Sequence, residues 1–161
     1  MKIAIAAREA AIARVTSPLP GSEPYENVRP LHISAKHDGL TLLDTLREVF
    51  PQIAAEYWLE RFAQQLLLDA HRQPVTSEQR VRSGERYLPR MPATSEPDVN
   101  AAIRVLHEDD AIVVINKPAP LPLHPSGRFN RNTLQSILHK VYYPQKLRPV
   151  HRLDANTTGI T

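Results

Sequence analysis

The sequence predicts an α+β fold in which a small helical unit precedes the start of a sheet. Apolar residues between Leu42 and Leu66 recur at the three- and four-residue spacing of helices, whereas β-branched runs begin at Ile103. A polar stretch rich in turn-forming residues separates the two regions. We therefore expect four parts: an N-terminal extension at 1–36, a helix-helix-hairpin unit at 37–92, a linker at 93–102 and a second domain at 103–161.

The composition indicates a cytoplasmic protein that does not enter a membrane. The 161 residues include no cysteine, which excludes disulfides and thiolate chemistry. No apolar run approaches the ~20 residues that a membrane-spanning helix needs. Four of the fifteen prolines fall within residues 1–36, where no apolar period is sustained, so we expect this extension to have little core of its own. We expect the chain to be a monomer.

The middle unit is predicted to contain two short helices followed by short strands. The first helix begins at Leu42 and stops before Pro51, and the second covers residues 55–66. Trp58 and Phe62 are four residues apart on the apolar face of the second helix, which favours a core position over base stacking. Strand-like segments follow at 66–69, 74–75 and 87–88.

The second domain is predicted to begin with a β-hairpin and to continue with one helix. The β-branched runs 103–106 and 112–115 flank turn-forming residues at 108–110, a pattern typical of an antiparallel hairpin. Asn132 or Thr133 can cap the helix that follows. Its apolar face has the spacing of an amphipathic helix and consists of Leu134, Ile137, Leu138 and Val141.

The positive charge of the chain is concentrated between Ile112 and Asp154. Asp154 is the only acidic residue in this stretch. The basic residues are Lys117, Arg128, Arg131, Lys140, Lys146, Arg148 and Arg152. Such a stretch attracts polyanions and releases their counterions on binding, although an ordinary solvated basic surface would have the same composition.

Two short motifs carry a family resemblance. The first is His151-Arg152-Leu153-Asp154 with the small polar turn that ends at Gly159, and the second is Asn116-Lys117-Pro118 with the following Leu123-His124-Pro125-Ser126-Gly127. In this order they closely resemble the RluA-type pseudouridine synthases. The resemblance implies that Asp154 is the catalytic aspartate and that residues 103–161 are the incomplete start of a mixed or antiparallel-sheet catalytic domain. It also implies a chain truncated just after its nucleophile, which we expect to be inactive by itself.

The chemistry of this family requires a carboxylate. Conversion of uridine to pseudouridine breaks the bond between C1′ and N1, rotates the uracil and joins its C5 to the sugar. The ribose carbon becomes electron-poor as the base departs, and a fixed aspartate can stabilise that charge or bond to the carbon. No redox step occurs, and the histidines lack the spacing of metal ligands, so we expect no cofactor and no metal.

The expected partner is RNA, either rRNA or tRNA. The resemblance implies that Arg152 holds the flipped nucleotide, with His151 near the same site. The charge pattern adds Arg128, Arg131 and Arg148 as phosphate contacts. A structural ion pair remains the alternative for Arg152, and a loop hydrogen bond remains the alternative for His151.

Residues 37–92 resemble a divergent S4-type RNA-binding domain. The resemblance rests on two short helices followed by a strand-turn-strand that ends at Arg82-Ser83-Gly84-Glu85. It makes Arg72 and Arg82 candidates for RNA contact, although nearby acidic residues allow an ordinary mixed surface. Two alternatives to an RNA-modifying enzyme therefore remain: a non-catalytic RNA-binding module and a non-functional truncated product.

Overall fold

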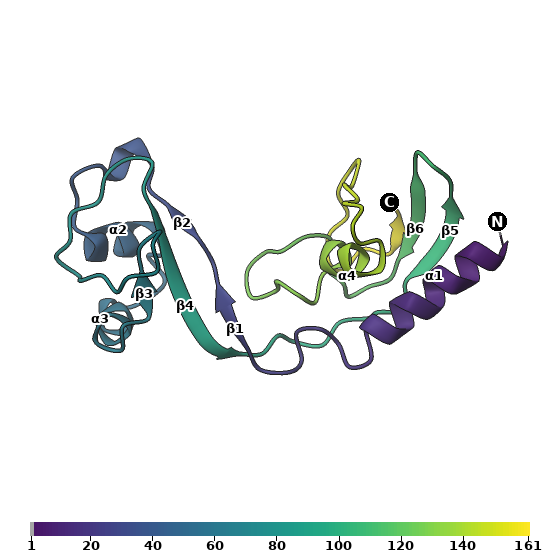
Figure 1. Cartoon of the computed structure of the whole chain (residues 1–161), viewed down its shortest axis with the longest axis horizontal. Coiled ribbons are helices and arrows are strands. Elements are labelled where there is room, and N and C mark those ends of the chain that lie inside the picture. The colour runs from purple at the N-terminus through teal and green to yellow at the C-terminus, as the bar shows by residue number, and fades with distance from the viewer. Residues whose placement is uncertain (1) are drawn as a thin grey trace. The chain divides into compact units, whose positions relative to one another are not determined.

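A computed structural model describes residues 2–161 and divides them into two compact units (Figure 1). The first unit contains residues 2–25 and 94–161, and the second contains residues 26–93. Both combine helices with antiparallel strands, which confirms the predicted α+β class. No helix formed by residues 2–161 has the length and apolar character needed to span a bilayer.

The first unit is built on a three-stranded antiparallel sheet in the order β5-β6-β7. Strands β5 (Arg104–Glu108) and β6 (Val113–Lys117) form the predicted hairpin. Its turn is closed by the Asp109 carboxylate, which accepts hydrogen bonds from the backbone N–H groups of residues 111 and 112. The short strand β7 (Gly159–Ile160) pairs with the end of β6 and so fixes the chain that follows Asp154.

Two helices complete the first unit. Helix α4 (Leu134–Val141) begins at Thr133, whose hydroxyl accepts a hydrogen bond from the Ser136 backbone N–H at 3.2 Å, so the predicted cap is confirmed. Helix α1 (Lys2–Val15) packs against β5 and α4 (Figure 1). The core between these elements is mainly aliphatic and includes Ile12, Ile103, Val105, Ile115, Leu121, Leu123, Leu134, Ile137 and Leu138.

Helix α1 differs from the predicted extension with little core of its own. Ile12 is only 2% exposed within the core of the first unit. Arg8 donates to Glu108 at 3.0 Å, and Arg104 of β5 donates to Glu9 at 2.6 Å. The charged residues that interrupt the apolar pattern of this helix are therefore the ones that tie it to the sheet.

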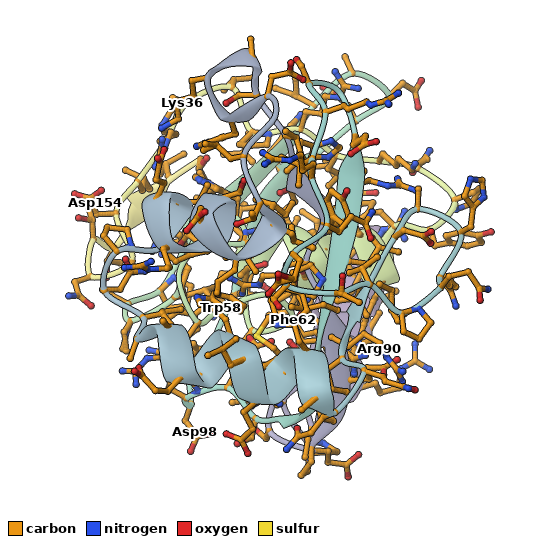
Figure 2. All side chains as sticks on the ribbon, turned by 90° about the vertical axis from the view of Figure 1, so that its left-hand side faces the viewer. Lys36, Trp58, Phe62, Arg90, Asp98 and Asp154 are labelled. Carbon is orange, nitrogen blue, oxygen red and sulfur yellow. The ribbon has the colours of Figure 1, made fainter. Side chains whose placement is uncertain are left out.

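The second unit has a sheet in which β4 (Arg86–Thr94) pairs with all three other strands: β1 (Tyr25–Val28), β2 (Leu31–His32) and β3 (Leu67–Leu68). A 3-10 turn at Ala35–His37 leads to helices α2 (Leu42–Val49) and α3 (Ala55–Ala63). Trp58 and Phe62 lie on the side of α3 that faces α2 (Figure 2). Trp58 is buried in the core, as predicted, and Phe62 packs against it.

The unit boundaries differ from the predicted ones at both ends of the middle unit. Strands β1 and β2 bring residues 26–36 into the second unit, because their backbone groups pair with β4. Strand β4 continues through Met91 to Thr94, and Glu96 is only 5% exposed. Part of the predicted 93–102 linker is therefore built into the two units.

Candidate active site

Asp154 lines a cavity of about 360 Å³ in the first unit. Its side chain is exposed, and Figure 2 shows its carboxylate at the surface of the molecule. The neighbouring Arg152 and Leu153 line the same cavity. The other lining residues come from the loop before α4 and from the residue after Asp154: Pro122, Leu123, His124, Ser126, Gly127, Arg128, Phe129 and Ala155.

The backbone at Asp154 and in the residues that follow it is held by hydrogen bonds. The Asp154 carbonyl accepts a hydrogen bond from the Thr157 N–H at 3.0 Å, which closes a tight turn. The Ala155 carbonyl accepts a hydrogen bond from the Leu121 N–H at 2.8 Å. Beyond the turn, Gly159 pairs with Lys117 of β6. The carboxylate therefore projects from a fixed backbone, although residues 151–158 form no regular helix or strand.

Lys117 joins the two sequence motifs through a buried ammonium group, which bonds to Ala155, 38 residues further along the chain. Its side chain is fully buried, and Nζ donates to the carbonyls of Pro118 at 3.0 Å, Leu121 at 2.9 Å and Ala155 at 3.3 Å. Burial lowers the pKa of Lys117, and the nearby negative charge of Asp154 partly offsets that effect. In the sequence, Lys117 belonged to a basic stretch and to the Asn116-Lys117-Pro118 motif, and neither assigned it a buried position. Its position at the end of an apolar strand was the signal for burial.

A tight turn at residues 126–129 also lines the cavity. Ser126 and Phe129 exchange two backbone hydrogen bonds, at 3.0 and 2.9 Å, and Gly127 adopts a φ of +51° between them. Arg128 lies at the tip of this turn with its side chain exposed. The residues that line the cavity thus include one aspartate, Asp154, and two arginines, Arg128 and Arg152.

The structure brings Arg128 and Arg152 together with Asp154 but places other predicted residues elsewhere. His151 and Arg148 line a different cavity, of about 430 Å³, which has an apolar wall built from β6 and α4. Arg131 has its guanidinium 3.6 Å from the centre of the Tyr25 ring. Within residues 2–161, neither Arg128 nor Arg152 forms an ion pair, so the ion-pair alternative for Arg152 finds no partner in this part of the chain.

The two candidate arginines of the second unit are also exposed. Arg72 lies in a turn with a left-handed φ of +63°, and its N–H donates to the Asp69 carbonyl. The Arg82 N–H donates to the Glu85 carboxylate at 2.9 Å. Both guanidinium groups belong to exposed residues and form no ion pair among residues 2–161.

This arrangement suits an electron-poor carbon of a phosphate-bearing substrate. An exposed carboxylate on a fixed backbone can stabilise positive charge at that carbon, and the flanking guanidinium groups can bind phosphates. The described residues, 2–161, contain no cluster of three histidine or acidic side chains that could ligate a metal ion.

Comparison with known proteins relates this chain to RNA pseudouridine synthases. Residues 111–161 match the family described as RNA pseudouridylate synthase. The human pseudouridylate synthase RPUSD2 is 45% identical over 69 residues, which cover 43% of this chain and 12% of that protein. The ribosomal large subunit pseudouridine synthase D of Nitrosomonas europaea is 30% identical over 156 residues, which cover 92% of this chain and 45% of that protein.

A third relative is named for a different RNA. The mitochondrial tRNA pseudouridine(32) synthase of Saccharomyces cerevisiae is 34% identical over 80 residues, which cover 50% of this chain and 17% of that protein. The chain therefore spans less than half the length of each of these three relatives.

Proposed function

We propose that this chain, which belongs to the RluA-type family of RNA pseudouridine synthases, carries in Asp154 the nucleophile with which full-length members of the family isomerise uridine to pseudouridine in RNA, and that the chain by itself is inactive. The observation that carries the proposal is the Asp154 cavity, which is lined by the exposed Asp154 and by two exposed arginines that form no ion pair in residues 2–161.

In the proposed reaction the Asp154 carboxylate lies against C1′ of the target ribose. The bond between C1′ and N1 breaks, and the carboxylate stabilises or bonds to the electron-poor carbon. The uracil rotates within the cavity, and its C5 forms the new bond to C1′. C5 then loses its proton and N1 takes one up, so the product is an isomer of the substrate.

Arg152 and Arg128, which both line the cavity, bind the RNA in this proposal. Extrusion of the target nucleotide from its stack costs a few kcal/mol, and contacts with both flanking phosphates offset that cost. Arg152 lies two residues before Asp154, so it is placed to hold the flipped nucleotide. Lys117 keeps the turn after Asp154 in place through the Ala155 carbonyl.

The second unit is proposed to be an S4-like RNA-binding unit. Its helices α2 and α3 precede β3 and β4, the order that the resemblance implies. Arg72 and Arg82 are the residues proposed to contact phosphates. Relatives named for the large ribosomal subunit and for tRNA leave rRNA and tRNA as the two substrate classes.

The function is tested by replacing Asp154 with asparagine. The change preserves size and hydrogen-bonding capacity but removes the negative charge, so it acts on the transition state more than on RNA binding. Release of tritium from RNA labelled at uridine C5 measures the reaction. The assay uses the chain alone and the chain joined to the part of the Nitrosomonas protein that it does not cover.

We expect pseudouridine to form only where Asp154 is present, with RNA affinity nearly equal in the two variants. Asp98→Asn is the matched control, because Asp98 lies in the same unit and outside the cavity. Activity in Asp154→Asn equal to that of the unchanged protein would contradict the assignment.

A further inference from the structure

Glu96 is a buried carboxylate that the proposed reaction does not use. It is 5% exposed and lies in the first unit, just after β4. It accepts hydrogen bonds from three consecutive backbone N–H groups, those of Asn130 and Asn132 at 2.9 and 2.8 Å and that of Arg131 at 2.8 Å. The Tyr25 hydroxyl donates a fourth hydrogen bond. Each carboxylate oxygen therefore receives two donors.

Asn132 and Gly21 pack closely around the Glu96 carboxylate. Asn132 is fully buried; its side chain accepts from the Gly21 N–H at 2.7 Å and donates to the Pro97 carbonyl at 2.9 Å. A Cβ atom at Gly21 would lie 2.7 Å from the carboxyl carbon of Glu96. The site thus requires both the carboxylate and a glycine beside it.

The segment that Glu96 holds is the arm at residues 126–132, which forms one wall of the Asp154 cavity. Its first part is the turn with Arg128 at the tip, and Phe129 also lines the cavity. Its last part carries the three N–H groups bound by Glu96. The Asn130 carbonyl accepts from the Ser136 hydroxyl at 2.7 Å, which ties the arm to α4 as well.

We propose that Glu96 is a positioning residue for RNA binding, because it fixes the 126–132 arm so that Arg128 meets a phosphate beside the target nucleotide. The proposal rests on the proposed function of the Asp154 cavity. A loop ordered in advance loses less conformational entropy when a ligand binds. Phe129 then offers an aromatic surface for a neighbouring base, and such stacking tolerates any sequence.

The surroundings of Glu96 favour the ionised form of its carboxyl group. Burial by itself would raise the pKa of Glu96, but the hydrogen bonds from Tyr25 and from the three backbone N–H groups outweigh burial and hold the pKa below its ordinary value. Glutamine at this position would present an NH₂ group to two of the donors. Glu96→Gln therefore releases the arm while it preserves the size of the side chain.

A double-mutant cycle on the full chain tests the role of Glu96. The Kd for a single-stranded RNA of about 15 nucleotides is measured by fluorescence anisotropy for Arg128→Ala, Glu96→Gln and the double variant. We expect Arg128→Ala to raise Kd about tenfold in the unchanged protein, as the loss of one charge-assisted hydrogen bond would. In the Glu96→Gln background we expect it to raise Kd less than about twofold, because the arm no longer holds Arg128 in place.

Glu108→Gln is the control background. Glu108 is also a partly buried carboxylate of the first unit, bonded to Arg8 and Tyr142, but it does not touch the arm. Arg128→Ala should keep its tenfold effect there. Gly21→Ala is the second test variant, because it displaces Glu96 without removing its charge, and it should reduce the effect of Arg128→Ala as Glu96→Gln does.

Hydrogen exchange of the amides at residues 130–132 gives a readout that needs no RNA. We expect faster exchange in Glu96→Gln and unchanged exchange in Glu108→Gln. An equal effect of Arg128→Ala in the unchanged and Glu96→Gln proteins would overturn the positioning role, as would unchanged exchange in Glu96→Gln. The isomerisation assay with Asp154→Asn tests the proposed function separately, so its failure can be told apart from failure of this cycle.

Discussion

The two units keep their shape by different means. Burial of side chains in the second unit is dominated by apolar groups around Trp58, and its buried residues include no lysine, arginine, aspartate or glutamate. The first unit buries a lysine and a glutamate, Lys117 and Glu96, each with at least three hydrogen bonds. Both of these charged groups bind backbone atoms of the loops that line the Asp154 cavity.

This difference shows which loops of the molecule are held in a fixed conformation. A buried charge with several hydrogen bonds adds little net stability compared with an apolar side chain, because desolvation opposes the attraction. It does fix the geometry of the groups it binds, since any displacement leaves a buried polar atom without a partner. The first unit therefore uses buried charges to hold loops beside the Asp154 cavity, and the core of the second unit is mainly apolar.

Trp58→Ala in the second unit should have the largest effect on stability. Removal of a buried aromatic side chain from a packed core typically costs about 3–5 kcal/mol. Leu59→Ala on the same helix is the control, because Leu59 is 46% exposed and should cost far less. Urea denaturation monitored by circular dichroism measures both. Equal losses for the two variants would mean that the core of the second unit is not centred on Trp58.

Lys117→Met in the first unit should reduce stability less than Trp58→Ala but should impair isomerisation. Three buried carbonyls lose their donor, at a cost of about 1–3 kcal/mol, and relief of the buried charge partly offsets this loss. The turn at Asp154–Ala155 loses the hydrogen bond from Lys117. In the chain joined to the remaining part of the Nitrosomonas protein, kcat for isomerisation should therefore fall more than RNA affinity. Lys146→Met, at an exposed position, serves as the control. Unchanged kcat in Lys117→Met would contradict its role in holding the turn.

Acid should lower the stability of the first unit by protonating Glu96. The folded-state pKa of Glu96 is below its ordinary value of 4.5, so its stabilising contribution is present above about pH 4.5 and is lost as the pH falls through the lower folded-state pKa. Glu96→Gln should remove this part of the pH dependence. Denaturation midpoints measured between pH 3 and pH 6 test this expectation. An identical slope in both proteins would show that Glu96 does not titrate in this window.

Arg82→Ala and Arg72→Ala in the second unit should have the smallest effects. If each arginine contacts one phosphate, each change reduces the slope of log Kobs against log salt by about 1 and weakens binding for all RNA sequences alike. Arg47→Ala is the control, because Arg47 already pairs with Asp44 at 3.6 Å on α2. Salt titrations of RNA binding measure the slopes. Unchanged slopes in both variants would contradict RNA binding by the second unit.

Local sequence patterns predicted most of the secondary structure. The spacing of apolar residues predicted α2, α3 and α4, and β-branched runs predicted the β5–β6 hairpin. These elements follow from side-chain periodicity, which a short segment contains in full. Helix α1 was missed because Arg8 and Glu9 interrupt its apolar pattern, and both residues find their partners about 100 positions away.

The candidate site was predictable in part. The motif around Asp154 and its order after Asn116-Lys117-Pro118 indicated the family, which the comparisons support. Within the second domain, the sequence also suggested Arg128, Arg131, Arg148, His151 and Arg152 as candidates for RNA contact. The structure places only Arg128 and Arg152 on the Asp154 cavity, because the chain turns so that residues 148 and 151 line another cavity.

The sequence by itself determined the α+β class, the main helices and the hairpin, and it indicated Asp154 as the candidate catalytic residue. These depend on residue types and spacings that act within a short segment. Only the tertiary structure decided the roles of Lys117 and Glu96. A lysine in a basic stretch and a glutamate in a polar linker look like surface residues until the fold removes water from them. Their roles depend on backbone groups more than 30 residues away, in the 126–132 arm and at Ala155.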